Sequence, residues 1–403
     1  MSLMHSAQLN LLNLQAYYPL EINLKIGFVY DAIHPYIKGG VETRIYKLSR
    51  ELAKKGHTIY LFGLKYWEGP DEIISDGIHL VGIAKANNLY NQQGKRSILN
   101  SILFSLNFYK LFKYDVDVYD CQNFPYLSCF SNKLVSILNK RKMFITWHEV
   151  WGNYWYNYSG KIVGTIGKFI EFLCSKITKN NIAVSKMTKS NLMKLGVLEK
   201  NIFIVNNGIN YNEIDLVLPS TNHYDLVCVG RLIEHKRIDY LIDVVDKLVI
   251  SNPKITCLIV GDGPDKPKLE EMVKSKKLSN NITFTGSLEK QEAVFAYMKS
   301  SKLFIFPSER EGFGIVVLEA NACGLPVICT DAPNNASKDL IENEKNGCVV
   351  EAGNIEQMAD AINKLLDSKE KLKQMSESSK QIAKSYSWEK IADDLILVYL
   401  KNS

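Results

Sequence analysis

The sequence has few cysteines, and no two of them are spaced as metal ligands. Eight of the 403 residues are cysteine, and Cys228, Cys257 and Cys329 lie inside apolar runs, where a thiol behaves as a small hydrophobic side chain. None of the seven histidines pairs with a cysteine or a second histidine at a ligand spacing. These absences exclude a disulfide scaffold, predict no metal site and favour a reducing, cytoplasmic environment.

Long uncharged apolar runs and a basic leader are also missing. Glu21 and Lys25 are the first charged side chains, so we interpret residues 1–24 as an N-terminal extension and not as a secretory signal. The most apolar stretch, residues 97–109, is followed at once by Lys110. It is shorter than the roughly 18 residues that span a bilayer. The sequence predicts a protein that is not integral to a membrane.

Composition predicts a globular protein with two domains. Hydrophobic residues make up 46% and charged residues 23% of a chain that exceeds the usual size of a single core. The first 215 residues carry a formal net charge of +9 and the remainder −3. The basic half favours an anionic partner or is a solvated basic face. Nucleic-acid binding would need a basic second half or a known fold signature, so we predict no nucleic-acid partner.

Short apolar runs alternate with longer amphipathic stretches, the pattern of βα units around parallel sheets. Apolar side chains recur at helical spacing from Val41 to Leu52 and Gly56 closes that helix. A polar linker at 211–223 separates two doubly wound halves, and we expect the ligand site in the cleft between them. The expected strands are 25–30, 58–62, 79–83, 117–121, 143–147, 182–184 and 203–205, then 226–229, 256–260, 282–285, 303–306, 327–329 and 348–350.

A glycine pair follows the first expected strand. Gly39 and Gly40 stand directly ahead of a helix, where backbone amides can approach a phosphate without a Cβ in the way. A glycine pair is also common in simple turns, and both interpretations stay open. The sequence has no Walker A motif, and the Gly-Asp-Gly-Pro at 261–264 lacks the third glycine of a dinucleotide fingerprint. Nicotinamide and P-loop chemistry therefore lose their main support.

Two cations follow the first expected strand of the second half. Arg231 and Lys236 lie between the strand end and the next helix start, where the helix field disfavours positive charge. A bound anion would explain this placement, and solvated surface charge is the alternative.

The strongest motif is a pair of glutamates, Glu311 and Glu319, eight positions apart after the strand at 303–306. Gly312 and Gly314 leave helix-start amides free for phosphates. If the stretch is helical, it covers about 12 Å, comparable with the distance from a hexose to a ribose across a diphosphate. We expect Glu319 to hold a ribose diol and Glu311 a hexose. A paired-carboxylate hydrolase is the alternative.

Together these motifs resemble those of the retaining glycosyltransferase family 4 (group 1), whose fold is GT-B. The resemblance implies an α/β architecture of two Rossmann-like, doubly wound domains that face each other across a cleft. The acceptor-binding domain would cover 25–212, the donor-binding domain 213–385, and a C-terminal helix at 386–403 would return to the first domain. The matching segments are Gly39-Gly40-Val41-Glu42, Ala183-Val184-Ser185, Val205-Asn206-Asn207-Gly208, Gly230-Arg231 with Lys236, Gly261-Asp262-Gly263-Pro264, Gly286-Ser287-Leu288, Glu311 to Glu319, and Ser387-Trp388-Glu389.

The resemblance also implies roles for individual residues. Arg231 and Lys236 would bind the donor diphosphate, Ser287 and Leu288 would border the base, and Trp388 would anchor the returning helix. The residues implied in catalysis are His148, Arg231, Lys236 and Glu311, and those implied in donor binding are Gly39, Gly40, Gly230, Ser287, Leu288, Phe313, Gly314, Ile315 and Glu319.

His148 ends the expected strand at 143–147 and resembles the histidine that the family keeps near the donor sugar. A lone histidine is also often structural, and the role of Glu149 stays open. Family members retain the anomeric configuration, and the usual proposal is same-face attack in which the leaving phosphate accepts the acceptor's proton. Side-chain cations and helix amides would stabilise that leaving group, so we expect no metal, and no cofactor beyond the nucleotide-sugar co-substrate. We assign the Asp-Val-Asp at 115–117 to structure.

Other functions remain possible on the same architecture. A nucleotide-sugar epimerase, a phosphorylase and a non-catalytic nucleotide-sugar-binding protein are the alternatives, although none has distinctive residues here. The expected acceptor is a glycan or a lipid-linked saccharide. Basic, aromatic segments at 95–113 and 155–179 could hold a peripheral enzyme on the cytoplasmic face of an anionic membrane, or could be core-facing helices.

Overall fold

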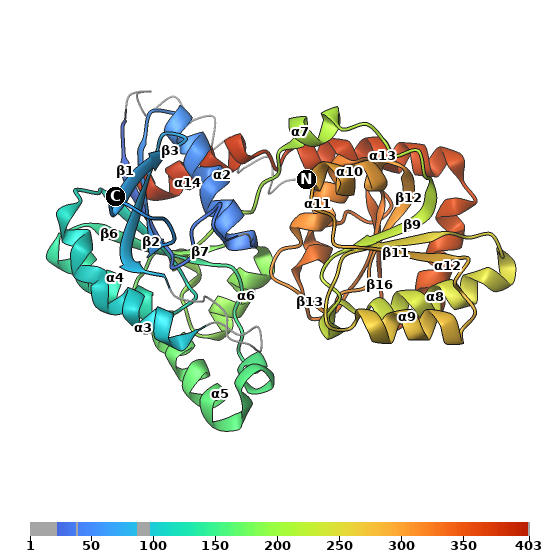
Figure 1. The fold of residues 1–403 in the computed structure, drawn as a ribbon, viewed down its shortest axis with the longest axis horizontal. Coiled ribbons are helices and arrows are strands. Elements are labelled where there is room, and N and C mark those ends of the chain that lie inside the picture. The colour runs from blue at the N-terminus through green and yellow to red at the C-terminus, as the bar shows by residue number, and fades with distance from the viewer. Residues whose placement is uncertain (1–21, 38, 87–96, 402–403) are drawn as a thin grey trace. The chain divides into compact units, whose positions relative to one another are not determined.

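The computed structural model describes residues 22–37, 39–86 and 97–401, and the chain forms two compact units, Met1–Ile145 and Thr146–Ser403 (Figure 1). Most of the predicted N-terminal extension and the start of the basic segment at 95–113 lie outside the described residues. The domain limits expected from the sequence differ from these units and stay a prediction.

The strands of the first unit lie in the order β3-β4-β2-β1-β5, so the chain's first strand lies between β2 and β5. Neighbouring strands pair in parallel, except that β3 is antiparallel at the edge. Every strand expected here is present, whereas the partly exposed β3 was not predicted. The strands are β1 (Lys25–Val29), β2 (Thr58–Lys65), β3 (Glu72–Ser75), β4 (Ile78–Lys85) and β5 (Val118–Gln122), and β6 (Lys142–Trp147) spans the boundary between the units.

Helix α2 confirms the helix predicted after the first strand. Gly39 is its N-cap residue, and Gly56, with φ of 89°, follows its end. Asp115 accepts from Lys25 and Arg141 at 2.8 Å each, which gives the Asp-Val-Asp segment a structural role in the first unit. The helices of this unit are α2 (Gly40–Lys54), α3 (Ile98–Leu106), η1 (Asn107–Lys113) and α4 (Leu127–Leu138).

The basic segment at 95–113 is only partly core-facing. Phe104 and Leu111 are buried, whereas Leu99 and Leu106 are more than half exposed. Among the described helices of the chain, none combines the length and the apolar character needed to cross a bilayer.

In the second unit a parallel sheet has the order β11-β10-β9-β12-β14-β16, so β9 lies inside the sheet between β10 and β12. All six strands lie where the alternation of apolar runs predicted them. They are β9 (Tyr224–Val229), β10 (Cys257–Val260), β11 (Ile282–Gly286), β12 (Ser301–Phe306), β14 (Val327–Thr330) and β16 (Gly347–Val350). The same unit contains β7 (Asn181–Ala183), parallel to β8 (Ile202–Ile204), and the two-residue strands β13 (Arg310–Glu311) and β15 (Asn334–Asn335).

Two apolar cores cover the two faces of this sheet. One packs α8, α9 and α12 against it, and the other packs α10 and α11; Figure 1 shows these two groups on opposite sides. The helices of the unit are α5 (Tyr154–Cys174), α6 (Lys186–Lys194), α7 (Tyr211–Leu216), α8 (Ile238–Ser251), α9 (Lys266–Ser275), α10 (Gln291–Lys299), α11 (Ile315–Ala322), α12 (Ile355–Leu366), α13 (Lys369–Lys384) and α14 (Trp388–Lys401), with η2 (Glu199–Asn201), η3 (Glu234–Lys236) and η4 (Ala336–Leu340).

The expected polar linker at 211–223 begins with a helix. Tyr211 and Ile214 of α7 are buried, so local apolar burial overrides the polar composition. Trp388, at the start of α14, packs against Gly208, where a Cβ would lie 2.8 Å from the indole. Ile209 N donates to Tyr386 O at 2.8 Å, so the start of the C-terminal helix is joined to the chain just before α7.

Candidate active site

The candidate site lies at the carboxyl ends of β9 and β12, two adjacent strands whose connections leave the sheet in opposite directions. This is the switch point at which open parallel sheets bind ligands. The loop after β9 carries Arg231 and Lys236, and the loop after β12 carries Glu311. Residues 75 positions apart in the sequence are thereby brought together.

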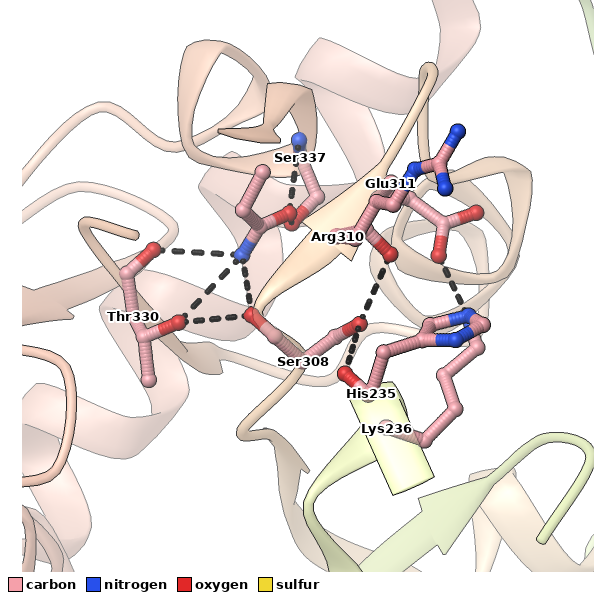
Figure 2. Close-up of polar contacts among 8 residues, drawn as sticks. His235, Lys236, Ser308, Arg310, Glu311, Thr330 and Ser337 are labelled. Carbon is pink, nitrogen blue, oxygen red and sulfur yellow. Dashed lines mark hydrogen bonds and ion pairs between the residues drawn. The ribbon is translucent and has the colours of Figure 1, made fainter. Parts of the chain in front are cut away.

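Lys236 forms an ion pair with Glu311, and both side chains are largely buried, with 15% and 23% of their surface exposed (Figure 2). The Lys236 ammonium also lies 4.9 Å from the centre of the Phe306 ring. The sequence predicted an anion beside Lys236. In the structure, the Glu311 carboxylate of the chain itself is one such anion. Arg231 is exposed, and no ion pair is recorded for it within the described ranges.

Buried hydrogen bonds fix the loop that carries Glu311. Ser308 Oγ donates to the carbonyls of His235 at 3.2 Å and Arg310 at 3.0 Å, so this loop is joined to the residue before Lys236. Asn335, completely buried, donates to Ser308 O at 3.0 Å and accepts from Ser337 Oγ at 2.6 Å. Figure 2 shows the labelled members of this network around Ser308. Satisfied buried polar groups hold one loop conformation.

Helix α11 begins without a side-chain cap. Its N-cap residue Gly314 has φ of 94°, a conformation that favours glycine, and a Cβ there would lie 2.6 Å from Ser337 Cβ. The uncapped helix start fits the predicted contact between its first amides and a phosphate, and that contact stays a prediction. The expected helical spacing from Glu311 to Glu319 is wrong, because Glu311 belongs to β13 and a turn precedes Ile315.

Glu319 is a half-buried carboxyl on α11. Gln291 Nε2 donates to it at 2.7 Å. Burial raises the pKa of Glu319 to about 7, and the hydrogen bond from Gln291 opposes part of that rise. A poorly solvated carboxylate is stabilised by hydrogen bonds from hydroxyl groups, and the two hydroxyls of a ribose would supply them.

Positive charge accumulates around His235. Burial, followed by the charges of Lys236, Arg310 and Arg231, lowers the pKa of His235 to about 4, so its imidazole is neutral at pH 7. His235 is half-buried, and of the three cations near it Lys236 and Arg310 are paired with Glu311 and Glu149.

The His148 segment contacts the Glu311 loop through the backbone. A Cβ at Gly312 would lie 2.5 Å from His148 O, so only glycine allows this approach. Glu149 accepts from Arg310 Nη2 at 2.9 Å and from Trp151 Nε1 at 2.7 Å. The open question about Glu149 is therefore answered: it joins the loop after β6 to the loop after β12.

The remaining predicted residues lie on separate loops. Ser287 is exposed and Leu288 half-buried after β11, whereas Gly39 and Gly40 belong to the first unit. A Cβ at Gly261 would lie 1.9 Å from Gly230 O, which places the loops after β9 and β10 in close contact. The roles of these residues in donor binding stay predictions.

Two cavities share Arg310 in their lining. One, of about 500 Å³, is lined by residues that include Trp151, Tyr154, Asn157, Lys194 and Arg310. The other, of about 600 Å³, shares Tyr154, Asn157 and Arg310. The Arg310 guanidinium stacks 3.3 Å from the centre of the Tyr154 ring. Sequence reasoning missed Arg310, Trp151 and Tyr154, although polar and aromatic residues after strand ends are a usable signal.

Comparison with known families identifies the class. A family model for glycosyl transferases group 1 matches residues 213–382, and one for glycosyltransferase family 4 matches residues 38–213. The chain belongs to the group 1, family 4 glycosyltransferases.

This glycosyltransferase is 25% identical over 374 residues to the phosphatidylinositol N-acetylglucosaminyltransferase gpi3 subunit of Schizosaccharomyces pombe, covering 90% of this chain and 77% of that protein. The structure of sucrose-phosphate synthase from Thermosynechococcus elongatus matches with a TM-score of 0.76 at 19% identity, over 94% of this chain and 99% of that one. Anabaena HepE in complex with UDP-glucose matches with a TM-score of 0.71 at 17% identity, over 94% and 100%. The fold is GT-B, as the motifs implied.

Proposed function

We propose that this glycosyltransferase transfers a hexose from a nucleotide-diphosphate sugar to a hydroxyl of a glycan or lipid-linked acceptor, with retention and without a metal ion. The observation that carries the proposal is the Lys236–Glu311 ion pair beside the uncapped start of α11. It places a cation, a carboxylate and free amides together at the switch point of the sheet.

In the proposed reaction, the bond between the anomeric carbon and the diphosphate oxygen breaks while the acceptor oxygen bonds from the same face. The acceptor's proton passes to the departing phosphate oxygen, so no protein base is required. Arg231, Lys236 and the amides of α11 oppose the charge that develops on that phosphate. Glu311 hydrogen-bonds the hexose, and Glu319 the ribose.

The acceptor proposal rests on the cavity beside Arg310. Its aromatic lining, with Trp151 and Tyr154, suits the apolar face of a sugar ring, and Lys194 adds a cation to that lining. The gpi3 relative is named for a phosphatidylinositol substrate, which supports a lipid-linked acceptor. Such an acceptor would place a peripheral enzyme on the cytoplasmic face of a membrane.

A thermal-shift panel tests the donor. Because a ligand that binds only the native state stabilises it, the cognate nucleotide sugar at a hundred times its Kd adds about 2.7 kcal/mol. We expect one of UDP-, GDP- and ADP-hexose to raise the melting temperature well above the others, with UDP-glucose favoured by the HepE likeness. No shift with any nucleotide sugar would contradict the donor assignment.

Metal removal tests the source of leaving-group stabilisation. Since side chains and helix amides supply the positive charge, we expect initial rates of nucleotide release to be unchanged within about twofold after EDTA treatment. Loss of activity that manganese or magnesium restores would show that a metal site is required.

A further inference from the structure

Helix α5 carries its apolar side chains on its exposed side. Gly160, with φ of 76°, breaks the helix, and the second part covers residues 161–174. The buried positions of this second part are Gly164, Gly167, Glu171 and Cys174. The exposed apolar ones are Ile162, Val163, Ile166, Phe169, Phe172 and Leu173, with exposed fractions between 38% and 80%. This is the reverse of an ordinary surface helix.

The buried face of α5 is closely packed. The helix therefore cannot rotate to bury its exposed apolar side chains, which we call the apolar stripe. A Cβ at Gly167 would lie 2.4 Å from the Trp155 ring, and one at Gly164 would lie 2.8 Å from Trp155 O. The buried carboxylate of Glu171 accepts from the amides of Trp151 at 2.7 Å and Gly152 at 2.8 Å. These contacts fix the rotation of the helix about its axis.

Apart from the buried Glu171, the charges along α5 and just after it are all positive. Between residues 150 and 180 the only acidic side chain is Glu171, which is buried. The same stretch carries four lysines, Lys161, Lys168, Lys176 and Lys179. The Lys176 ammonium lies 5.4 Å from the centre of the Phe172 ring, so cation and apolar stripe adjoin. Apolar side chains bordered by lysine are typical of helices that lie in the interface of an anionic bilayer.

We propose that α5 docks the enzyme on an anionic lipid surface, with the stripe from Ile162 to Leu173 at the headgroup boundary and the lysines at the lipid phosphates. This inference rests on the proposed function, because docking on lipid would serve transfer to a lipid-linked acceptor. It names the surface that would bring the enzyme to that acceptor. In a symmetric dimer through this helix, lysines would face lysines, and the stretch has no exposed acidic side chain to pair with them. Charge therefore favours an anionic lipid surface over a second copy of the chain.

Sedimentation of the full chain with vesicles tests this proposal. We expect binding to phosphatidylcholine vesicles that contain phosphatidylglycerol, little binding to phosphatidylcholine alone, and weaker binding at high salt. The double variant Ile162→Glu/Phe169→Glu should lower the vesicle partition coefficient at least about tenfold. Ile250→Glu is the matched control, because Ile250 on α8 is 82% exposed, and it should leave partitioning unchanged.

Three outcomes would overturn the proposal: no co-sedimentation at low salt, equal partitioning of the double variant and the wild type, or a solution dimer that the double variant abolishes. Melting temperature and nucleotide-sugar binding should be the same in the double variant and the wild type. Failure of the docking surface is therefore distinguishable from failure of the proposed activity, which transfer to a water-soluble acceptor measures separately.

Discussion

Replacement of Lys236 by alanine is expected to lower kcat/KM about 10²- to 10³-fold, the usual effect of removing one group that stabilises a developing anion. The same substitution leaves the largely buried carboxylate of Glu311 without its cation. Glu311→Ala should cause a loss of similar size, since Glu311 both holds Lys236 and faces the donor sugar in the proposed reaction. Nucleotide release with saturating acceptor measures both.

The two residues should act as a unit. If they do, the double variant Lys236→Ala/Glu311→Ala will lose much less than the product of the two single effects. Lys276→Ala is the matched control, because Lys276 is also ion-paired, with Asp246 at 2.7 Å, but lies away from the switch point. A folded Lys236→Ala enzyme with a near wild-type rate would refute the assignment.

Replacement of Glu319 by glutamine is expected to stabilise the free enzyme and weaken donor binding. Burial favours the neutral carboxyl, so wild-type stability falls as the pH rises from about 4.5 to about 7 and stays reduced above pH 7. The loss is at most about 3 kcal/mol. Glutamine keeps an acceptor for Gln291 and removes the titration, so the variant should melt several degrees higher at pH 8 and at the same temperature near pH 4.5.

Glu319→Gln should weaken nucleotide binding although it stabilises the free enzyme, because an amide is a weaker acceptor for ribose hydroxyls than a carboxylate. Nucleotide affinity should fall about tenfold at pH 8. Glu292→Gln on α10, an exposed neighbour of Gln291, should change neither quantity. Equal melting curves for Glu319→Gln and wild type at pH 8 would show that Glu319 does not titrate as described.

Much of the fold follows from local sequence patterns. Strands β9, β10, β12 and β14 are short apolar runs bounded by turn residues, and burial on both faces of a parallel sheet demands that pattern. The edge strand Glu72–Ser75 was not predicted, because its side chains are only partly buried and it lacks a continuous apolar run. Helix α7 was predicted as a polar linker, because the burial of only two of its side chains outweighs its polar composition.

The site was predictable in its parts but not in its pairings. Glycines and glutamates after strand ends indicated a phosphate- and sugar-binding site. The partners of Lys236 and Glu149, however, lie 75 and 161 positions away, so no spacing rule reveals them. Asn335 is a further case, because its hydrogen bonds depend on where β14 and the loop after β12 meet.

The buried carboxylate of Glu171 makes α5 and the donor loop parts of one connected system. It holds the amides at 151 and 152, Trp151 donates to Glu149, and Glu149 pairs with Arg310, next to Glu311. Coupling through such contacts is reciprocal: whatever factor a lipid surface contributes to donor affinity, donor binding must contribute to lipid affinity. If the lipid surface strengthens donor binding, the enzyme stays longer on the membrane while it holds its donor; if it weakens donor binding, the bound donor shortens that stay.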